Sequence, residues 1–274
     1  MFFLIFILIN FANSAKILTF TYFPSVSHQY VFGNLVKELS LRGHDVTFVT
    51  TNPMSDPKLK NLSEIDISAA YQLFNKYALS DITIQNYGFI YVSSTMNDFN
   101  HDAISIEMDA KGVQELLTRP DDFYDLILVE AHCTILYGLG HKFKAPVVAI
   151  SSLDIISYMH GVFGNSMHPV LYPDMFSEHI GPLKRLLEKL DSLYINFMWW
   201  FTEEYYFLSR DDKLARRYFG DDMPYLRDLI SEASLLLLNV NPIFSSGRPN
   251  APNVIEYFNV HTKRNEFFPP VSMF

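Results

Sequence analysis

Short apolar runs and helical patterns alternate along this chain, beginning near its amino terminus. Residues 17–23 form an apolar run, and residues 46–50 form a second one. Between them, four apolar residues recur at the spacing of one helical face: Val31, Leu35, Val36 and Leu39. Gly43 follows at a position where a helix end favours a left-handed residue. Residues 16–51 are therefore predicted to form a strand, a helix and a second strand parallel to the first.

The same alternation continues through the rest of the chain. We expect further strands at residues 64–69, 89–93, 125–130, 147–150 and 234–240, and helices at residues 97–119, 134–143, 182–207 and 223–231. The run DLILVE is typical of a strand that is covered on both faces. From residue 241 onward no element is predicted. This order predicts an α/β fold with a Rossmann-like, doubly wound parallel sheet.

Composition narrows the class of protein. The chain has 274 residues, of which 49% are hydrophobic, so it can bury a substantial core. Its formal net charge is −9, and Lys and Arg form no long run. We therefore expect no nucleic-acid partner, because phosphate binding needs clustered positive charge. Cys133 is the single cysteine, so no disulfide can form within the chain.

The sequence also predicts a signal peptide, the bounds of the domain and a glycosylation site. Residues 1–15 join an apolar core to small residues, as a secretory signal peptide does. We expect one domain at 16–245 and a divergent tail at 246–274. No later stretch offers eighteen uncharged apolar residues, so we expect no transmembrane anchor. Asn61 begins the single glycosylation sequon and follows a polar loop, which predicts an exposed acceptor asparagine.

His28 is the first candidate for chemistry. It stands where the loop after the first strand enters the helix, at the sheet edge where open α/β folds bind ligands. The helix dipole there disfavours the imidazolium form and leaves the ring available as a base. Ser27 beside it is a natural N-cap residue. A second interpretation is that His28 only caps the helix or packs under the loop.

A histidine base benefits from a carboxylate that orients it, and the run DLILVE offers two. Asp125 opens this strand and Glu130 closes it, so the two are about 16 Å apart along an extended chain. If the strand is parallel to the first one, Glu130 lies at the edge of His28 and Asp125 at the opposite edge. Glu130 is the predicted partner; the alternative is a solvated or helix-capping carboxylate.

The sequence lacks the motifs that are typical of metal sites, nucleophilic hydrolases and phosphate-binding loops. No HxxxH, HExxH or CxxC arrangement is present, so we expect no metal site. Four further histidines share no helical face: His132, His141, His160 and His168. No nucleophile elbow or glycine-rich phosphate loop appears, which disfavours a hydrolase and a dinucleotide-dependent dehydrogenase.

The second half of the longest helical pattern, FMWWFTEEYYFL, is unusually aromatic. Three interpretations remain open for it. Its side chains can pack on the sheet, contact a membrane surface, or line a pocket for a small molecule. In the last case the candidate lining residues are Trp199, Trp200, Phe201 and Tyr205.

Three stretches resemble the amino-terminal half of animal UDP-glycosyltransferases. They are AKILTFTYFPSVSHQYVFGNLVKELSLRGHDVTFVTT, DFYDLILVEAHCTILYGLGHKFKAPVVAISS and SEASLLLLNVNPIFSSGRPNAPNV. The first is the most specific, through its SH pair before a helix and its RGHDVT ending. Together they reach from about residue 15 to about residue 255, in the right order.

The resemblance implies a GT-B glycosyltransferase, of which this chain is the amino-terminal, acceptor-binding domain. It implies that His28 is the general base and that Glu130, where the family usually has aspartate, orients it. Ser27 joins the four aromatic residues as a candidate acceptor-binding residue. A small lipophilic acceptor is implied, with a UDP-sugar as co-substrate and no cofactor bound by this chain. A homo- or hetero-dimer in the lumen of the endoplasmic reticulum is a further expectation.

The family's UDP-sugar-binding signature and its membrane anchor are absent from these 274 residues. We therefore expect the chain by itself to be inactive, as a fragment, a splice form or a truncated relative. The alternative is a non-catalytic lumenal protein of this family that binds lipophilic molecules or a partner.

Overall fold

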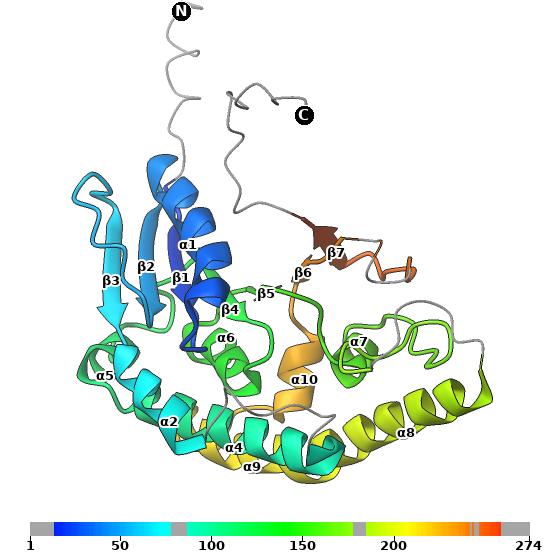
Figure 1. The fold of residues 1–274 in the computed structure, drawn as a ribbon. Coiled ribbons are helices and arrows are strands. Elements are labelled where there is room, and N and C mark those ends of the chain that lie inside the picture. The colour runs from blue at the N-terminus through cyan, green and yellow to red at the C-terminus, as the bar shows by residue number, and fades with distance from the viewer. Residues whose placement is uncertain (1–13, 78–86, 178–184, 242, 244–246, 259–274) are drawn as a thin grey trace, which may run out of the picture.

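A computed structural model describes residues 14–77, 87–177, 185–241, 243 and 247–258 of this chain. Strands and helices alternate along most of it (Figure 1). The elements are β1 (Lys16–Phe20), α1 (Val26–Leu41), β2 (Asp45–Thr50), β3 (Leu62–Asp66), η1 (Ser68–Gln72), α2 (Leu73–Tyr77), α4 (Phe89–Met108), α5 (Lys111–Leu117), β4 (Leu126–Glu130), η3 (Thr134–Tyr137), α6 (Gly138–Phe143), β5 (Val147–Ser151), α7 (Ser157–Val162), α8 (Leu186–Thr202), η4 (Glu203–Phe207), α9 (Leu208–Phe219), α10 (Leu226–Ser231), β6 (Leu235–Asn239) and β7 (Val254–Tyr257).

Within the described residues, all seven strands form one parallel sheet in the order β3-β2-β1-β4-β5-β6-β7. The chain builds outward from β1 to β3 and then returns to place β4 on the other side of β1. This reversal is the topological switch point of a doubly wound sheet. The expected Rossmann-like α/β fold is therefore confirmed.

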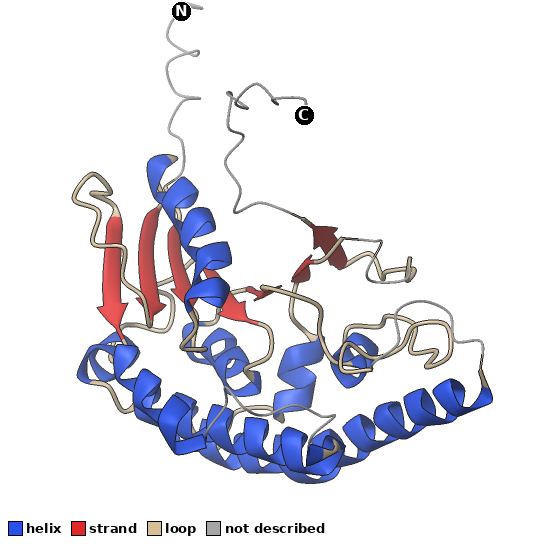
Figure 2. Cartoon of the chain, in the orientation of Figure 1, coloured by secondary structure: helices blue, strands red, loops and turns tan. Residues whose placement is uncertain are grey.

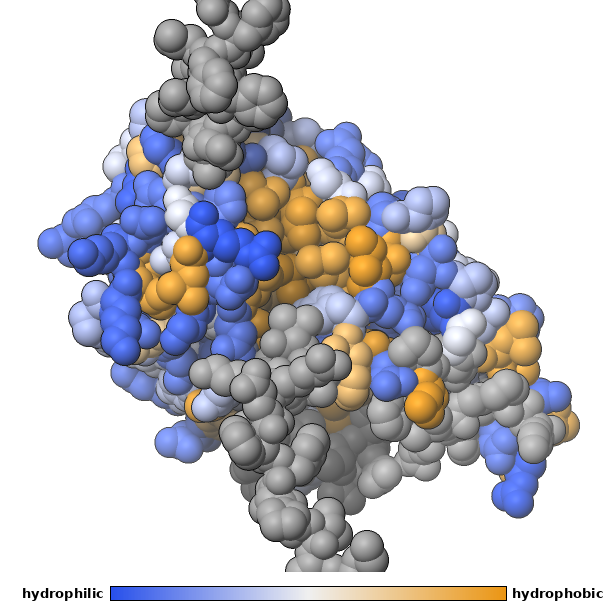
Figure 3. Space-filling model, turned by 90° about the horizontal axis from the view of Figure 1, so that it is seen from above, coloured by the Kyte–Doolittle hydropathy of each residue, from blue (hydrophilic) through white to orange (hydrophobic). Residues whose placement is uncertain are grey.

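Alternate residues of each strand point to opposite layers. In β1, Ile17 belongs to a core cluster with Phe32 of α1, whereas Leu18 belongs to the larger cluster on the other side of the sheet. Below the carboxyl ends of the strands, α2, α4, α8 and α9 form a continuous band of helices (Figure 2). Seen from above, hydrophobic side chains gather in the middle of the opposite face (Figure 3).

The expected strand at residues 89–93 is wrong, because this stretch is the first part of α4. Phe89, Val92 and Ser93 are buried, and their spacing is that of one helical face. Gly88, with a φ of 76°, turns the chain into this helix. The expected helix at 97–119 is also two helices, since α4 ends at Met108 and α5 follows from Lys111.

The region beyond residue 241 holds an element that the sequence did not predict. β7 pairs with β6 as the last strand of the sheet, so the domain extends past residue 245. The long aromatic helix begins at Leu186 and does not stop at residue 207, because the π-helical turn η4 joins it to α9. Residues 1–13 of the expected signal peptide lie outside the described residues, and Asn61 is exposed as predicted.

Candidate active site

A cavity of about 330 Å³ lies at the carboxyl ends of the central strands. Its lining is largely apolar and aromatic, with Phe23 from the loop after β1, Ile104 from α4 and Trp199 from α8. His28 and Glu130 line the same cavity. Because β1 and β4 are neighbours at the switch point, the cavity occupies the place where doubly wound sheets bind their ligands.

His28 and Glu130 form a hydrogen-bonded pair. Nδ1 of His28 lies 3.0 Å from Oε1 of Glu130, whose side chain is 1% exposed. The Nδ1–H group donates to the carboxylate, so Nε2 keeps the lone pair that can take up a proton. The ring of Phe23 stacks on that of His28 with 4.7 Å between the centroids. This stacking and the hydrogen bond fix the orientation of the imidazole.

Backbone groups hold the other oxygen of the Glu130 carboxylate. The N–H groups of Tyr22 and Phe23 donate to Oε2 at 3.1 and 3.0 Å. Both groups belong to the loop that follows β1, and β1 pairs in parallel with β4. The carboxylate therefore has three donors directed at it, which compensates for its burial.

Asp125, the other carboxylate of the strand, lies away from this pair. It precedes β4, and its Oδ2 accepts a hydrogen bond from the N–H of Lys16 at 2.7 Å. Lys16 is the first residue of β1, so Asp125 stands at the amino edge of the sheet. The structure thus brings Glu130 to His28 and leaves Asp125 at the opposite edge, because parallel strands carry like ends to like edges.

The loop before α1 is tied to the sheet by Gln29, which the sequence analysis did not single out. Its Oε1 accepts hydrogen bonds from the hydroxyls of Thr21 and Thr50 at 2.7 and 2.6 Å, and its Nε2 donates to the carbonyl of Phe23 at 2.9 Å. The N-cap residue of α1 is Ser25, so the expected N-cap Ser27 is wrong. Ser27 is exposed, and its hydroxyl contacts that of Ser25 at 2.9 Å.

Only one of the four candidate aromatic residues of the long helix lines the cavity. Trp199 is buried, and its Nε1–H donates to Oδ1 of Asp174 at 3.1 Å. Trp200, Phe201 and Tyr205 contact one another away from the lining, in ring pairs with 5.4 to 5.6 Å between centroids. Neighbouring helical residues are about 100° apart, so Trp199 and Trp200 cannot face the same side.

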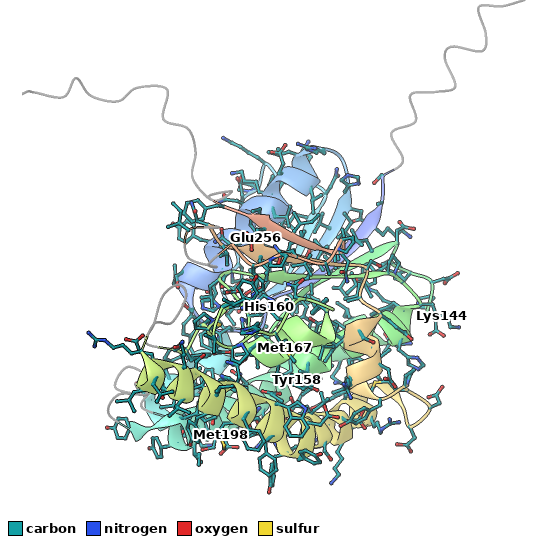
Figure 4. All side chains as sticks on the ribbon, turned by 90° about the vertical axis from the view of Figure 1, so that its right-hand side faces the viewer. Lys144, Tyr158, His160, Met167, Met198 and Glu256 are labelled. Atoms are coloured by element: carbon teal, nitrogen blue, oxygen red, sulfur yellow. The ribbon has the colours of Figure 1, made fainter. Side chains whose placement is uncertain are left out.

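Two further histidines, His132 and His160, belong to a polar network around Asp154. Nε2 of His160 lies 2.9 Å from Oδ1 of Asp154, and its ring lies between β7 and α8 in the view of Figure 4. Burial lowers the pKa of His160 and of His132, although nearby carboxylates oppose the shift. In the described part of the chain, no three His, Cys, Asp or Glu side chains converge as metal ligands would.

Several polar residues of the lining were not predicted from the sequence, among them His101, Glu203 and Asp211. One signal could have found Glu203. It continues the buried face of α8, since Ile195, Trp199 and Glu203 recur every four residues and are all buried. A carboxylate on an otherwise apolar face is unusual and indicates a specific role.

No known family model matches the chain. The chain is 32% identical over 266 residues to the ecdysteroid UDP-glucosyltransferase of Lymantria dispar multicapsid nuclear polyhedrosis virus, over 93% of this chain and 52% of that protein. It is 28% identical over 276 residues to UDP-glucosyltransferase 2 of Dactylopius coccus, over 96% of this chain and 51% of that protein.

Among solved structures, a UDP-glucosyltransferase from Polygonum tinctorium is 12% identical, with a TM-score of 0.41, over 91% of this chain and 52% of that chain. The sequence similarities relate this chain to the UDP-glycosyltransferases along most of its own length. The chain spans about half the length of the curated relatives it matches.

Proposed function

We propose that this chain is the acceptor-binding domain of a UDP-glycosyltransferase, the amino-terminal domain of a GT-B enzyme. The pair formed by His28 and Glu130 at the switch point carries the proposal, because it places an oriented base in a largely apolar cavity. The similarity to UDP-glucosyltransferases supports it independently.

In the proposed reaction His28 takes the proton of an acceptor hydroxyl on Nε2. The acceptor oxygen forms a bond to the anomeric carbon of the sugar, while the bond from that carbon to the β-phosphate oxygen breaks. UDP leaves with the electron pair, and the sugar carbon inverts. Glu130 stabilises the imidazolium that forms and keeps Nδ1 protonated throughout. The UDP-sugar would be held by a second domain.

The lining supports a small lipophilic acceptor. Apolar walls with few polar groups are typical of sites for such molecules. Several viral relatives are named as ecdysteroid UDP-glucosyltransferases, which supports an acceptor with an apolar skeleton and a hexose as the transferred group. Trp199 is the one proposed aromatic acceptor contact that the cavity lining supports.

The test joins this chain to the remaining half of the Lymantria dispar virus relative and compares variants of the hybrid. His28→Ala is expected to lower kcat/KM for a phenolic acceptor roughly 10²- to 10⁴-fold, because the general base is lost. His168→Ala is the control, since His168 is exposed and lies outside the cavity lining.

Acceptor binding is measured separately on the 274-residue chain, by titration calorimetry. His28→Ala should leave binding of naphthalen-2-ol within about threefold, because a base acts mainly on the transition state. Unchanged turnover in the His28→Ala hybrid, or no binding of the phenol by the chain, would refute the proposal.

An alternative function is that of a non-catalytic lumenal protein that binds lipophilic molecules, a membrane or another member of the family. Its support is the exposed apolar side of α8, where Leu186, Leu187 and Phe197 are 71%, 79% and 55% exposed. Such a helix can lie on a membrane surface. Of the helices described, none combines the length and the hydropathy that crossing a bilayer needs.

Two measurements separate this alternative from the leading proposal. Co-sedimentation with phosphatidylcholine vesicles should fall when Leu187 and Phe197 are both replaced by serine. Turnover by the hybrid enzyme with UDP-glucose would count against a purely non-catalytic role. A secretory location is part of both proposals, and it is tested by glycosylation at Asn61 in secreting cells.

A further inference from the structure

A second set of polar side chains lines the cavity, and it comes from elements other than those that carry His28 and Glu130. Glu203 begins the π-helical turn η4 between α8 and α9 and is 8% exposed. Among the described residues, no side chain or backbone group forms a hydrogen bond with its carboxyl group. π-helical turns inside long helices occur frequently at functional sites. This turn therefore directs an unpaired carboxyl group into an apolar cavity.

His101 and Asp211 stand beside Glu203 in the lining and form a pair of their own. Nδ1 of His101 lies 3.2 Å from Oδ1 of Asp211, and the hydroxyl of Thr134 donates to Oδ2 at 2.6 Å. Asp211 therefore has partners for both of its oxygens. Glu203 is thus the carboxyl group of this set that has no hydrogen-bond partner among the described residues.

The charge state of Glu203 follows from its surroundings. Burial, with the negative charge of Asp211 as a smaller cause, raises the pKa of Glu203 to about 8, and Arg210 opposes the shift. At neutral pH the carboxyl group therefore keeps its proton and can both donate and accept a hydrogen bond. Burying such a group without a partner costs free energy, which a bound polar group would recover.

We propose that the cavity accepts molecules with two polar ends, one hydroxyl at His28 and a second hydroxyl held by Glu203. The proposal rests on the proposed function, because it assigns the second contact of the same acceptor. A hydroxyl fits this subsite because it donates and accepts, as the protonated carboxyl group of Glu203 does. A cationic end does not fit, since Arg210 already supplies a positive charge next to Glu203.

The test uses the 274-residue chain and three matched pairs of phenols, with binding followed by titration calorimetry. The pairs are phenol with benzene-1,4-diol, naphthalen-2-ol with naphthalene-2,6-diol, and biphenyl-4-ol with biphenyl-4,4′-diol. They place the second hydroxyl at three increasing distances from the first. At least one diol is expected to bind roughly five- to twentyfold more tightly than its partner, as one buried hydrogen bond allows.

Variants of Glu203 assign the preference to this residue. Glu203→Leu should abolish the preference for the diol and leave binding of the single-hydroxyl partner within about threefold, because the apolar contacts remain. Glu203→Gln should keep the preference, since an amide also donates and accepts. Glu232→Leu is the control, because Glu232 is exposed at the end of α10.

The outcomes separate this proposal from the proposed function. Equal binding within all three pairs, or a diol preference that survives in Glu203→Leu, overturns the second contact while leaving the acceptor site in place. Failure of all six phenols to bind overturns both. Loss of the preference in Glu203→Leu with its retention in Glu203→Gln supports the assignment.

Discussion

At the scale of single residues, the proposed chemistry depends on how one buried carboxylate is held. Glu130 receives hydrogen bonds from two backbone N–H groups and from the ring of His28, so both of its oxygens have partners. Tyr22 and Phe23 supply the backbone groups because the loop after β1 crosses the end of β4. The glutamate side chain thus reaches the loop after β1 and the ring of His28 at the same time.

Glu130→Gln is expected to lower kcat/KM of the hybrid enzyme roughly 10²- to 10⁴-fold, because a neutral amide can neither orient nor stabilise the imidazolium form of His28. The variant should also unfold more easily, by about 1–3 kcal/mol, since an amide NH₂ would face a backbone donor. Turnover and urea unfolding measure the two effects.

Asp125→Asn, at the other end of the same strand, is the matched control and should leave turnover unchanged. A Glu130→Gln enzyme with normal turnover would show that the carboxylate only fills space.

A second prediction at this scale concerns stability and pH. The pKa of Glu203 is about 8 in the folded protein, whereas its ordinary value is 4.5. Between these values the folded state keeps a proton that the unfolded chain has lost, so stability falls as the pH rises through this window. Asp211, Arg210 and the neighbouring His101 are the charged or titratable groups around it.

Glu203→Gln removes this loss, because the amide does not ionise in either state. We expect the variant to be more stable than the unmodified chain at pH 8.5, by roughly 1–4 kcal/mol, and nearly equal to it at pH 4.5. Urea unfolding at the two pH values measures the difference. Glu232→Gln, at an exposed position, should show no such pH dependence.

At the scale of elements, two connections decide which side chains line the cavity. Gln29 ties the loop before α1 to β1 and β2, and this places His28 above the end of β4. η4 joins α8 to α9 without a break, so Trp199, Glu203 and Asp211 all line one cavity. A regular α-helix through the same residues would rotate α9 relative to α8, because a π-helical turn holds an extra residue.

β7 supports the sheet beyond the expected end of the domain. Val254 is buried, and the neighbouring Ala251 donates its N–H to Oδ1 of Asn165 at 2.7 Å. A chain ending at residue 245 is therefore expected to be less stable than one ending at residue 258, by at least about 2 kcal/mol. For a domain of this size the melting temperature should fall by roughly 4–8 °C.

Calorimetry on the two truncated chains tests this expectation. The double substitution Ile255→Ser and Glu256→Ser in the longer chain, at positions that are not buried, controls for a general effect of altering the tail. Equal melting temperatures for the two truncated chains would show that the domain ends before β7.

At the scale of the whole molecule, the sheet gathers residues that are far apart in sequence. His28, His101, Glu130, Glu203 and Asp211 come from five different elements, and all of them line one cavity at the carboxyl ends of the strands. The band of helices formed by α2, α4, α8 and α9 closes this side (Figure 1). The partner of His28 could be predicted because parallel strands align their ends. The place of Glu203 in the same cavity could not be predicted, because helices approach the cavity from beyond the sheet.

The sequence alone determined the strands and helices whose burial is encoded locally. β1, α1, β2, β4, β5 and β6 follow from apolar runs and helical spacing, and the edge shared by His28 and Glu130 follows from parallel strands. Tertiary structure decided the secondary structure of residues 89–93. These residues have the composition of a strand, but they form a helix whose buried Phe89 packs against Trp199 of α8. Tertiary structure also decided which tryptophan faces the cavity and how Glu203 is charged, because both depend on packing between elements that no local pattern records.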